Sequence, residues 1–187
     1  MLNKYVQFKP TYDLLLKLII ALIFTCALGP LTVSIPGEIP LTLQTFFLLL
    51  FAIGFGWKVG ALNALLYVLF GMAGLPVFAG YNGGIENLSG SSGGFFFGFI
   101  AGALISGYMA ESNKKDSPFI HIAAWFVGHA IILLLGGYWL SKFLPEIWFE
   151  SIKSTLPGAA IKSAVGFLII QLLIRFLAGR KEFYEAK

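Results

Sequence analysis

The sequence predicts an all-α integral membrane protein with six transmembrane helices, and two observations carry that prediction. Of its 187 residues, 58% are hydrophobic and only 12% are charged, whereas soluble domains are about 45–50% apolar and about 25% charged. The apolar residues also gather in six long runs, and a membrane-spanning helix needs about 20 such residues. Because the runs extend along the whole chain, we expect residues 1–187 to form a single membrane domain in the lipid bilayer.

Polar or helix-breaking residues delimit each predicted helix in turn. The six helices are expected at residues 14–31, 41–55, 61–75, 95–110, 119–140 and 159–178. Pro36, Gly37 and Pro40 separate the first helix from the second, and the segment GWKVG separates the second from the third. The second and third runs are short for a full span, so we expect each of these two helices to include flanking residues. The segment ESNKKDSP follows the fourth helix, a mixed segment precedes the sixth, and a polar tail follows it.

The distribution of Lys and Arg predicts that both termini are cytoplasmic, because cytoplasmic loops carry an excess of these residues. With the N-terminus inside, the cytoplasmic side holds Lys4, Lys9, Lys17, Lys58, Lys114, Lys115, Arg175, Arg180, Lys181 and Lys187. The outer side then holds only Lys142, Lys153 and Lys162. This orientation places the connection between the third and fourth helices on the outer side.

That connection is a glycine-rich segment, residues 76–94, which we call the lid loop. Its sequence, PVFAGYNGGIENLSGSSGG, contains six glycines and has no Lys or Arg. Glycine lets the backbone approach other groups closely, and loops of this length are usually lids or binding loops. We interpret it as a lid over an outward-facing pocket for a small polar ligand. A solvated connector without a ligand is the alternative.

The motifs of several other protein classes are missing from the sequence. There is no G-x-x-x-x-G-K-[ST] loop for ATP phosphates. The serines of the lid loop lie in the glycine-rich run LSGSSGG and do not follow a predicted strand, as the serine of a nucleophile elbow does. His121 and His129 both fall in the fifth helix with no third ligand at hand, so we expect packing roles and no metal site. Lys and Arg are scattered at segment ends and do not form a basic face, which argues against nucleic acid. We expect neither an enzyme nor a cofactor.

Five motifs of the sequence resemble those of the BioY family of biotin transporters. Between Ile39 and Phe99 these are PLTLQTF, G-x-K-x-G-A-L, GLPVFAG and G-x-S-G-G-F-x-x-G-F. A fifth motif at the start of the sixth helix, LPGAAIK, resembles the family's Pro-Gly-Asp-x-x-Lys. The motifs occur in the order of the family and are jointly specific, although no single one is decisive.

The resemblance implies a substrate-binding S-component of an energy-coupling factor (ECF) transporter. Such a component has six helices and binds biotin near the outer side, beneath the loops that join helices 1 and 2 and helices 3 and 4. Its implied partners are a transmembrane coupling protein and two cytoplasmic ATPases, which hydrolyse the ATP, in the cell membrane of a prokaryote. An S-component for another vitamin, of the thiamine or riboflavin type, is the alternative.

The polar groups of biotin, a ureido ring and a carboxylate, need complementary residues in the pocket. Lys162, in an apolar stretch of the sixth helix, is expected to pair with the carboxylate, or else to extend to the membrane interface. Asn82 is expected to contact the ureido group, or else to stabilise the lid loop, and Tyr81 beside it could stack or donate its hydroxyl. Gln44 and Thr42 are expected to face the ligand, with an interhelical hydrogen bond as the alternative for Gln44.

Two candidate positions follow from departures from the family pattern. The aspartate of Pro-Gly-Asp-x-x-Lys, an implied ureido partner, is Ala159 in this sequence. Glu86 is the only acid of the lid loop, and we expect it either to accept the ureido N–H groups or to pair with Lys162. A solvated loop acid is the alternative. Phe95 stands where many relatives have tyrosine, and we expect it to form an apolar wall of the pocket.

Overall fold

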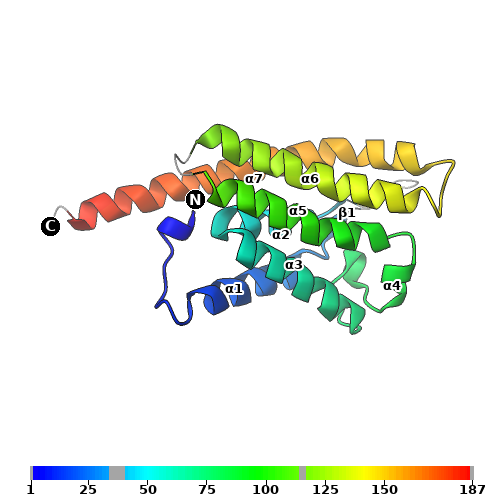
Figure 1. Ribbon diagram of the computed structural model, residues 1–187, viewed down its shortest axis with the longest axis horizontal. Coiled ribbons are helices and arrows are strands. Elements are labelled where there is room, and N and C mark those ends of the chain that lie inside the picture. Colours follow the sequence, from blue (N-terminus) through cyan, green and yellow to red (C-terminus); the bar gives the residue numbers. More distant parts are fainter. Residues whose placement is uncertain (1, 34–40, 114–116, 186–187) are drawn as a thin grey trace.

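The computed structural model describes residues 2–33, 41–113 and 117–185, and these are mostly helical (Figure 1). The longer helices are α1 (Asp13–Leu28), α2 (Gln44–Phe55), α3 (Trp57–Met72), α5 (Gly93–Glu111), α6 (Pro118–Leu140) and α7 (Trp148–Glu185). The shorter elements are η1 (Leu2–Lys4), η2 (Ala79–Tyr81), α4 (Glu86–Ser89), β1 (Thr32–Val33) and β2 (Leu41–Thr42). The two strands pair antiparallel, with Thr32 opposite Thr42. The all-α prediction is confirmed for the described residues.

The helices begin and end near the predicted residues, except that α7 begins much earlier than residue 159 and continues past residue 178 to Glu185. It starts at Trp148 and continues through Pro157. In the turn before the proline, the hydroxyls of Ser154 and Thr155 donate to backbone carbonyls three residues earlier. Proline is more frequent in membrane helices than in soluble ones. The polar segment before residue 159 therefore belongs to the helix.

The helices α2 and α5 lie in the middle of the bundle. α5 packs against α6, α3 and α2, whereas α1 packs on α2 and α3, and α7 mainly on α6. Figure 1 shows α6 and α7 along one side, with α1 and α3 along the other. The contact between α5 and α6 depends on glycine, since a Cβ at Gly98 would lie 2.9 Å from the Cα of Ile132. Small residues allow such close approach of membrane helices.

Within the described ranges, three helices are long and apolar enough to cross a membrane, namely α5, α6 and the Trp148–Gly179 part of α7. The helices α2 and α3 are apolar but shorter, with 12 and 16 residues, and α1 also has 16. Large apolar side chains remain exposed on the outside of the bundle, such as Ile23 at 60% and Leu172 at 64%. This surface suits hydrocarbon better than water, and the chain is a membrane protein.

The two ends of the bundle carry different elements. The helix α4 of the lid loop lies at one end, whereas η1 and the C-terminal part of α7 lie at the other (Figure 1). Several residues used above lie outside the described ranges: Pro36, Gly37, Pro40, Lys114, Lys115 and Lys187.

Candidate functional site

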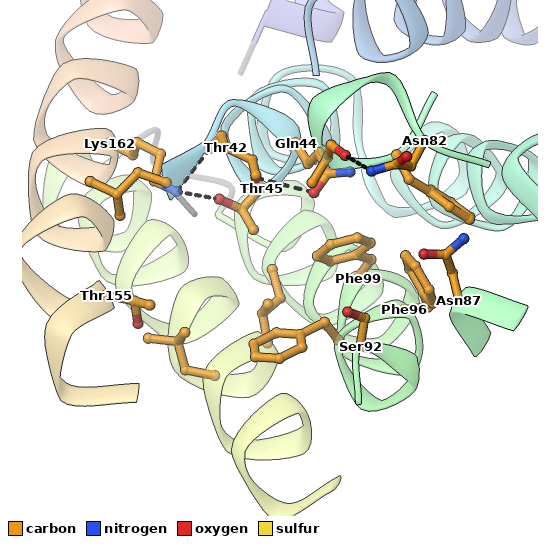
Figure 2. A pocket seen from close by; sticks show the side chains of 16 residues that line it. Thr42, Gln44, Thr45, Asn82, Asn87, Ser92, Phe96, Phe99, Thr155 and Lys162 are labelled. Atoms are coloured by element: carbon orange, nitrogen blue, oxygen red, sulfur yellow. Dashed lines mark hydrogen bonds between the residues drawn. The ribbon is translucent and has the colours of Figure 1, made fainter. Parts of the chain in front are cut away.

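A cavity of about 300 Å³ lies between α2, α5, α6, α7 and the lid loop (Figure 2). Its volume is at the lower end of the range for small-molecule sites, about 300–1,000 Å³. The residues that line it are Leu41, Thr42, Gln44, Thr45, Phe78, Ala79, Asn82, Asn87, Ser92, Phe95, Phe96, Phe99, Ile132, Leu133, Thr155 and Lys162.

One end of the cavity holds the cation of Lys162. Its Nζ donates to Oγ1 of Thr45 at 2.8 Å and to the carbonyl oxygen of Thr42 at 3.2 Å. A Cβ at Gly158 would lie 2.7 Å from Cδ2 of Leu41, so this glycine lets strand β2 pack against α7 beside Lys162. Within the described ranges, no carboxylate lies at salt-bridge distance from Nζ. Lys162 is therefore a half-buried cation whose protein partners are neutral.

The opposite end of the cavity carries the amides of the lid loop (Figure 2). Nδ2 of Asn82 donates to the carbonyl oxygen of Ala79 at 3.0 Å. Nδ2 of Asn87 donates to the carbonyl oxygens of Gly83 at 3.0 Å and Gly84 at 3.2 Å. Both amide nitrogens are thus held by the backbone of the lid loop itself.

The wall between the two ends is largely aromatic. Phe96 stacks on Phe78 of the lid loop, with ring centroids 4.4 Å apart, and meets Phe99 edge-on at 5.8 Å. Phe95 and Ile132 add further apolar surface. Such a wall suits the apolar part of a ligand whose polar groups lie at its two ends.

The lid loop is folded against the bundle at three points. The backbone N–H of Gly80 donates to the carbonyl of Pro30 at 3.0 Å, and that of Gly84 to Gly71 at 2.7 Å. Nε1 of Trp139 on α6 donates to the carbonyl of Gly90 at 2.9 Å. These bonds tie the segment to the residues that follow α1, to α3 and to α6, so it does not extend away from the bundle.

Five of the seven predicted site residues line the cavity: Lys162, Asn82, Gln44, Thr42 and Phe95. Tyr81 and Glu86 do not line it. The Tyr81 side chain is 52% exposed, and its backbone has a φ of 61°, which is uncommon for a residue other than glycine. Glu86 is exposed and lies against Gly84. Its predicted contact with the ligand or with Lys162 stays a prediction that requires the lid loop to rearrange.

Several lining residues were not singled out from the sequence, among them Thr45, Asn87, Ser92 and Thr155. Asn87 and Ser92 belong to the predicted lid loop, whose composition was the only signal for them. Thr155 lies in the part of α7 that the sequence did not predict as helix. Thr45 follows Gln44 directly, and only its contact with α7 reveals its role.

The two histidines of α6 form hydrogen bonds with α7. Nδ1 of His129 lies 3.0 Å from Oγ of Ser163, and Nδ1 of His121 lies 2.9 Å from Nε2 of Gln171. In the described part of the chain, no three His, Cys, Asp or Glu side chains are placed to hold a metal ion. The contacts of both histidines join two helices, as expected of packing residues.

Comparison with known proteins gives a consistent result. The model of the BioY family matches residues 3–179. The chain is 42% identical over 134 residues to the biotin transporter BioY of Thermotoga maritima. This alignment covers 65% of this chain and 78% of that protein. It is 29% identical over 189 residues to a probable biotin transporter BioY of Rickettsia prowazekii. This second alignment covers 96% of this chain and 92% of that protein.

A solved structure has a similar fold. It is the crystal structure at 2.1 Å of the S-component for biotin from an ECF-type ABC transporter. The TM-score is 0.79 at 23% sequence identity, and the match covers 88% of this chain and 92% of the other. At this identity the likeness concerns the fold alone, and it agrees with the helical bundle described above.

Proposed function

The chain belongs to the BioY family, and from this premise we propose that it takes up biotin as the high-affinity substrate-binding S-component of an ECF transporter. It is a transport protein and not an enzyme. In this proposal a transmembrane coupling protein and two cytoplasmic ATPases are its partners, and the ATPases hydrolyse the ATP that drives uptake. The protein lies in the cell membrane of a prokaryote and crosses it several times.

One observation carries the choice of ligand. The cavity has at one end a lysine that meets no acid among the described residues, amides at the other end and aromatic side chains between them. Biotin has a carboxylate at one end, a ureido group at the other and apolar ring and chain atoms between. A buried or half-buried cation is costly unless an anion accompanies it, and the carboxylate of biotin supplies that anion.

The proposed roles of the residues follow from this match. Lys162 binds the carboxylate through a charge-assisted hydrogen bond. Gln44 and Asn82 contact the ureido group, Thr42 faces the ligand near Lys162, and Phe95 forms part of the apolar wall. Tyr81 and Glu86 reach the ligand only if the lid loop rearranges when biotin binds.

We also propose a topology and a transport cycle. All six longer helices span the membrane together, with both termini cytoplasmic and the lid loop on the outer side. The position of the lid loop at the end opposite η1 and the C-terminal part of α7 supports this orientation (Figure 1). Biotin is captured from outside, the lid loop closes over it, and the partner subunits drive its release to the cytoplasm.

Titration calorimetry on the purified protein in detergent tests the ligand. We expect saturable binding of biotin and no binding of thiamine or riboflavin. A protein shown to be folded that does not bind biotin would contradict the proposal. Binding of thiamine or riboflavin in place of biotin would identify an S-component for another vitamin.

Uptake of labelled biotin by cells tests the partners. Cells that express the chain with the coupling protein and both ATPases should accumulate biotin. The control is the same set of proteins with the P-loop lysine of each ATPase replaced, which leaves assembly possible but prevents ATP hydrolysis. Equal accumulation in the two strains would contradict the proposed dependence on the ATPases.

A further inference from the structure

A chain of buried hydrogen bonds runs from the cavity to the start of the lid loop. The hydroxyl of Tyr67 on α3 donates to the carbonyl oxygen of Val77. Nε2 of Gln44 on α2 donates to the oxygen of that hydroxyl at 2.5 Å. At the cavity, Oγ1 of Thr42 donates to Oε1 of Gln44 at 3.1 Å. Tyr67 is fully buried and does not line the cavity, whereas Gln44 does.

The direction of this chain is fixed by its last member. The backbone carbonyl of Val77 can only accept, so the single hydroxyl hydrogen of Tyr67 must point toward it. The oxygen of Tyr67 is then an acceptor, and the group that faces it must be the NH2 of Gln44. The carbonyl oxygen of Gln44 is consequently the end of the amide that faces Thr42 and the cavity.

The two asparagines of the lid loop are oriented by the same principle. The amide nitrogens of Asn82 and Asn87 donate to backbone carbonyls, which cannot donate in return. Within the described residues no protein donor bonds the oxygen of either amide. With Gln44, this part of the cavity therefore combines three amide side chains whose nitrogens are each held by at least one protein acceptor. Their orientations are fixed, so the carbonyl oxygens are available to accept from a ligand.

We propose that Tyr67 is a positioning residue that holds the Gln44 amide with its carbonyl oxygen toward the ligand, so that the site selects a head group with N–H donors. The inference rests on the proposed function, because the ureido ring of biotin carries two such N–H groups. Without the Tyr67 hydroxyl, the Gln44 amide is free to turn and can present either its oxygen or its nitrogen. The selection for N–H donors then weakens, although the cavity keeps its shape.

Calorimetry tests this role by comparing the affinities of the wild-type and Tyr67→Phe proteins for three ligands. These are biotin and its two N-methyl derivatives, each methylated on one of the two ureido nitrogens. We expect Tyr67→Phe to weaken biotin binding about tenfold, the effect of one buried hydrogen bond left unmade. Binding of the derivative methylated at the nitrogen that faces Gln44 should change by less than about twofold, since it has no hydrogen to donate there. If Tyr67 only supported the lid loop, all three ligands would weaken by the same factor, and that result would overturn the inference.

Two further variants keep the test decisive. Gln44→Met removes the acceptor but leaves the bond between Tyr67 and Val77 intact, so it should also lose the preference for biotin over that derivative. A Gln44→Met protein with the full wild-type preference would overturn the inference even if Tyr67→Phe did not fold. Tyr108→Phe is the control for loss of a hydroxyl, since this side chain on α5 is 61% exposed and does not line the cavity.

The failure of this inference and the failure of the proposed function give different results. A wild-type protein that does not bind biotin contradicts the proposed function itself. A wild-type protein that binds biotin, with an unchanged preference in both Tyr67→Phe and Gln44→Met, contradicts only the role of Tyr67.

Discussion

Lys17 and Lys162 are both lysines held within the helical bundle, but among the described residues only Lys17 has an acidic side chain that balances its charge. The Lys17 side chain on α1 is 1% exposed, and its Nζ lies 2.6 Å from Oδ2 of Asp13. The same Nζ donates to Oδ1 of Asn3 in η1 and lies 5.9 Å from the centre of the Phe55 ring. An acid, an amide and an aromatic ring therefore surround this cation, which ties the N-terminal segment to α1.

Lys162 has no such set of partners in the part of the chain that the structure describes. Its two hydrogen bonds go to the neutral oxygens of Thr45 and Thr42, and it lines a cavity. The comparison indicates that, for a lysine in a membrane protein, the identity of its partners distinguishes a structural role from a binding role better than its degree of burial does. A cation paired within the chain stabilises the fold, whereas one left with neutral partners is suited to an anionic ligand.

The largest expected effect is that of Lys162→Ala on biotin binding. Loss of the cation should weaken binding by at least about 30-fold, because truncating one partner of a desolvated charge pair costs about 2–5 kcal/mol. Lys17→Ala is the matched control and should bind biotin with wild-type affinity. Calorimetry measures the biotin affinity of both purified variants. Equal affinities would contradict the claim that Lys162 binds the ligand and Lys17 does not.

Asp13→Asn should affect stability and leave binding unchanged. It deprives the buried Lys17 of its carboxylate, which we expect to lower the free energy of unfolding by about 1–3 kcal/mol. The control is Glu150→Gln, which removes an ion pair with Lys153 whose side chains are 70% and 62% exposed. Such exposed pairs contribute little. Thermal unfolding in detergent compares the variants, and an Asp13→Asn protein as stable as Glu150→Gln would contradict the structural role.

Thr45→Val should weaken biotin binding moderately. The valine keeps the shape of the side chain but removes the oxygen that accepts from Lys162 at 2.8 Å. We expect about a threefold to tenfold loss of affinity, the usual range for one hydrogen bond. Thr155→Val also changes the cavity lining, but the Thr155 hydroxyl donates to its own helix, so its effect should be smaller. A larger loss of biotin affinity in Thr155→Val than in Thr45→Val would contradict the assigned position of Lys162.

The smallest expected effect is that of Glu86→Gln. Glu86 is the acid of the lid loop that could have paired with Lys162 as Asp13 pairs with Lys17, but it lies outside the cavity lining. In the described arrangement, biotin affinity should change by less than about twofold. A tenfold or greater loss would show instead that the lid loop rearranges on binding and brings Glu86 to the ligand.

The all-helical fold, and Lys162 as a candidate that lines the cavity, can be found from local signals in the sequence, for physical reasons. The apolar runs are long and are separated by proline, glycine or charge, so hydropathy alone locates them. Lys162 was recognisable as a lone charge in an apolar stretch and by its place in the LPGAAIK motif. These signals are local in the sequence.

The remaining features depend on contacts between distant segments, which the sequence does not display. Thr45 meets Lys162 across more than a hundred residues, and Tyr67 is indistinguishable by sequence from an ordinary buried aromatic residue. The early start of α7 was missed because Pro157 suggests a break. The position of Glu86 depends on how the lid loop folds, and its composition alone does not determine that.

The most direct test of the account is a comparison of biotin with its neutral amide on wild type and Lys162→Ala. We predict that the wild-type protein binds biotin at least about tenfold more tightly than biotin amide, because only biotin supplies the anion. Lys162→Ala should bind the two ligands with affinities within about threefold of each other. A Lys162→Ala protein that keeps the wild-type preference for the carboxylate would contradict the central claim that Lys162 is the partner of that charge.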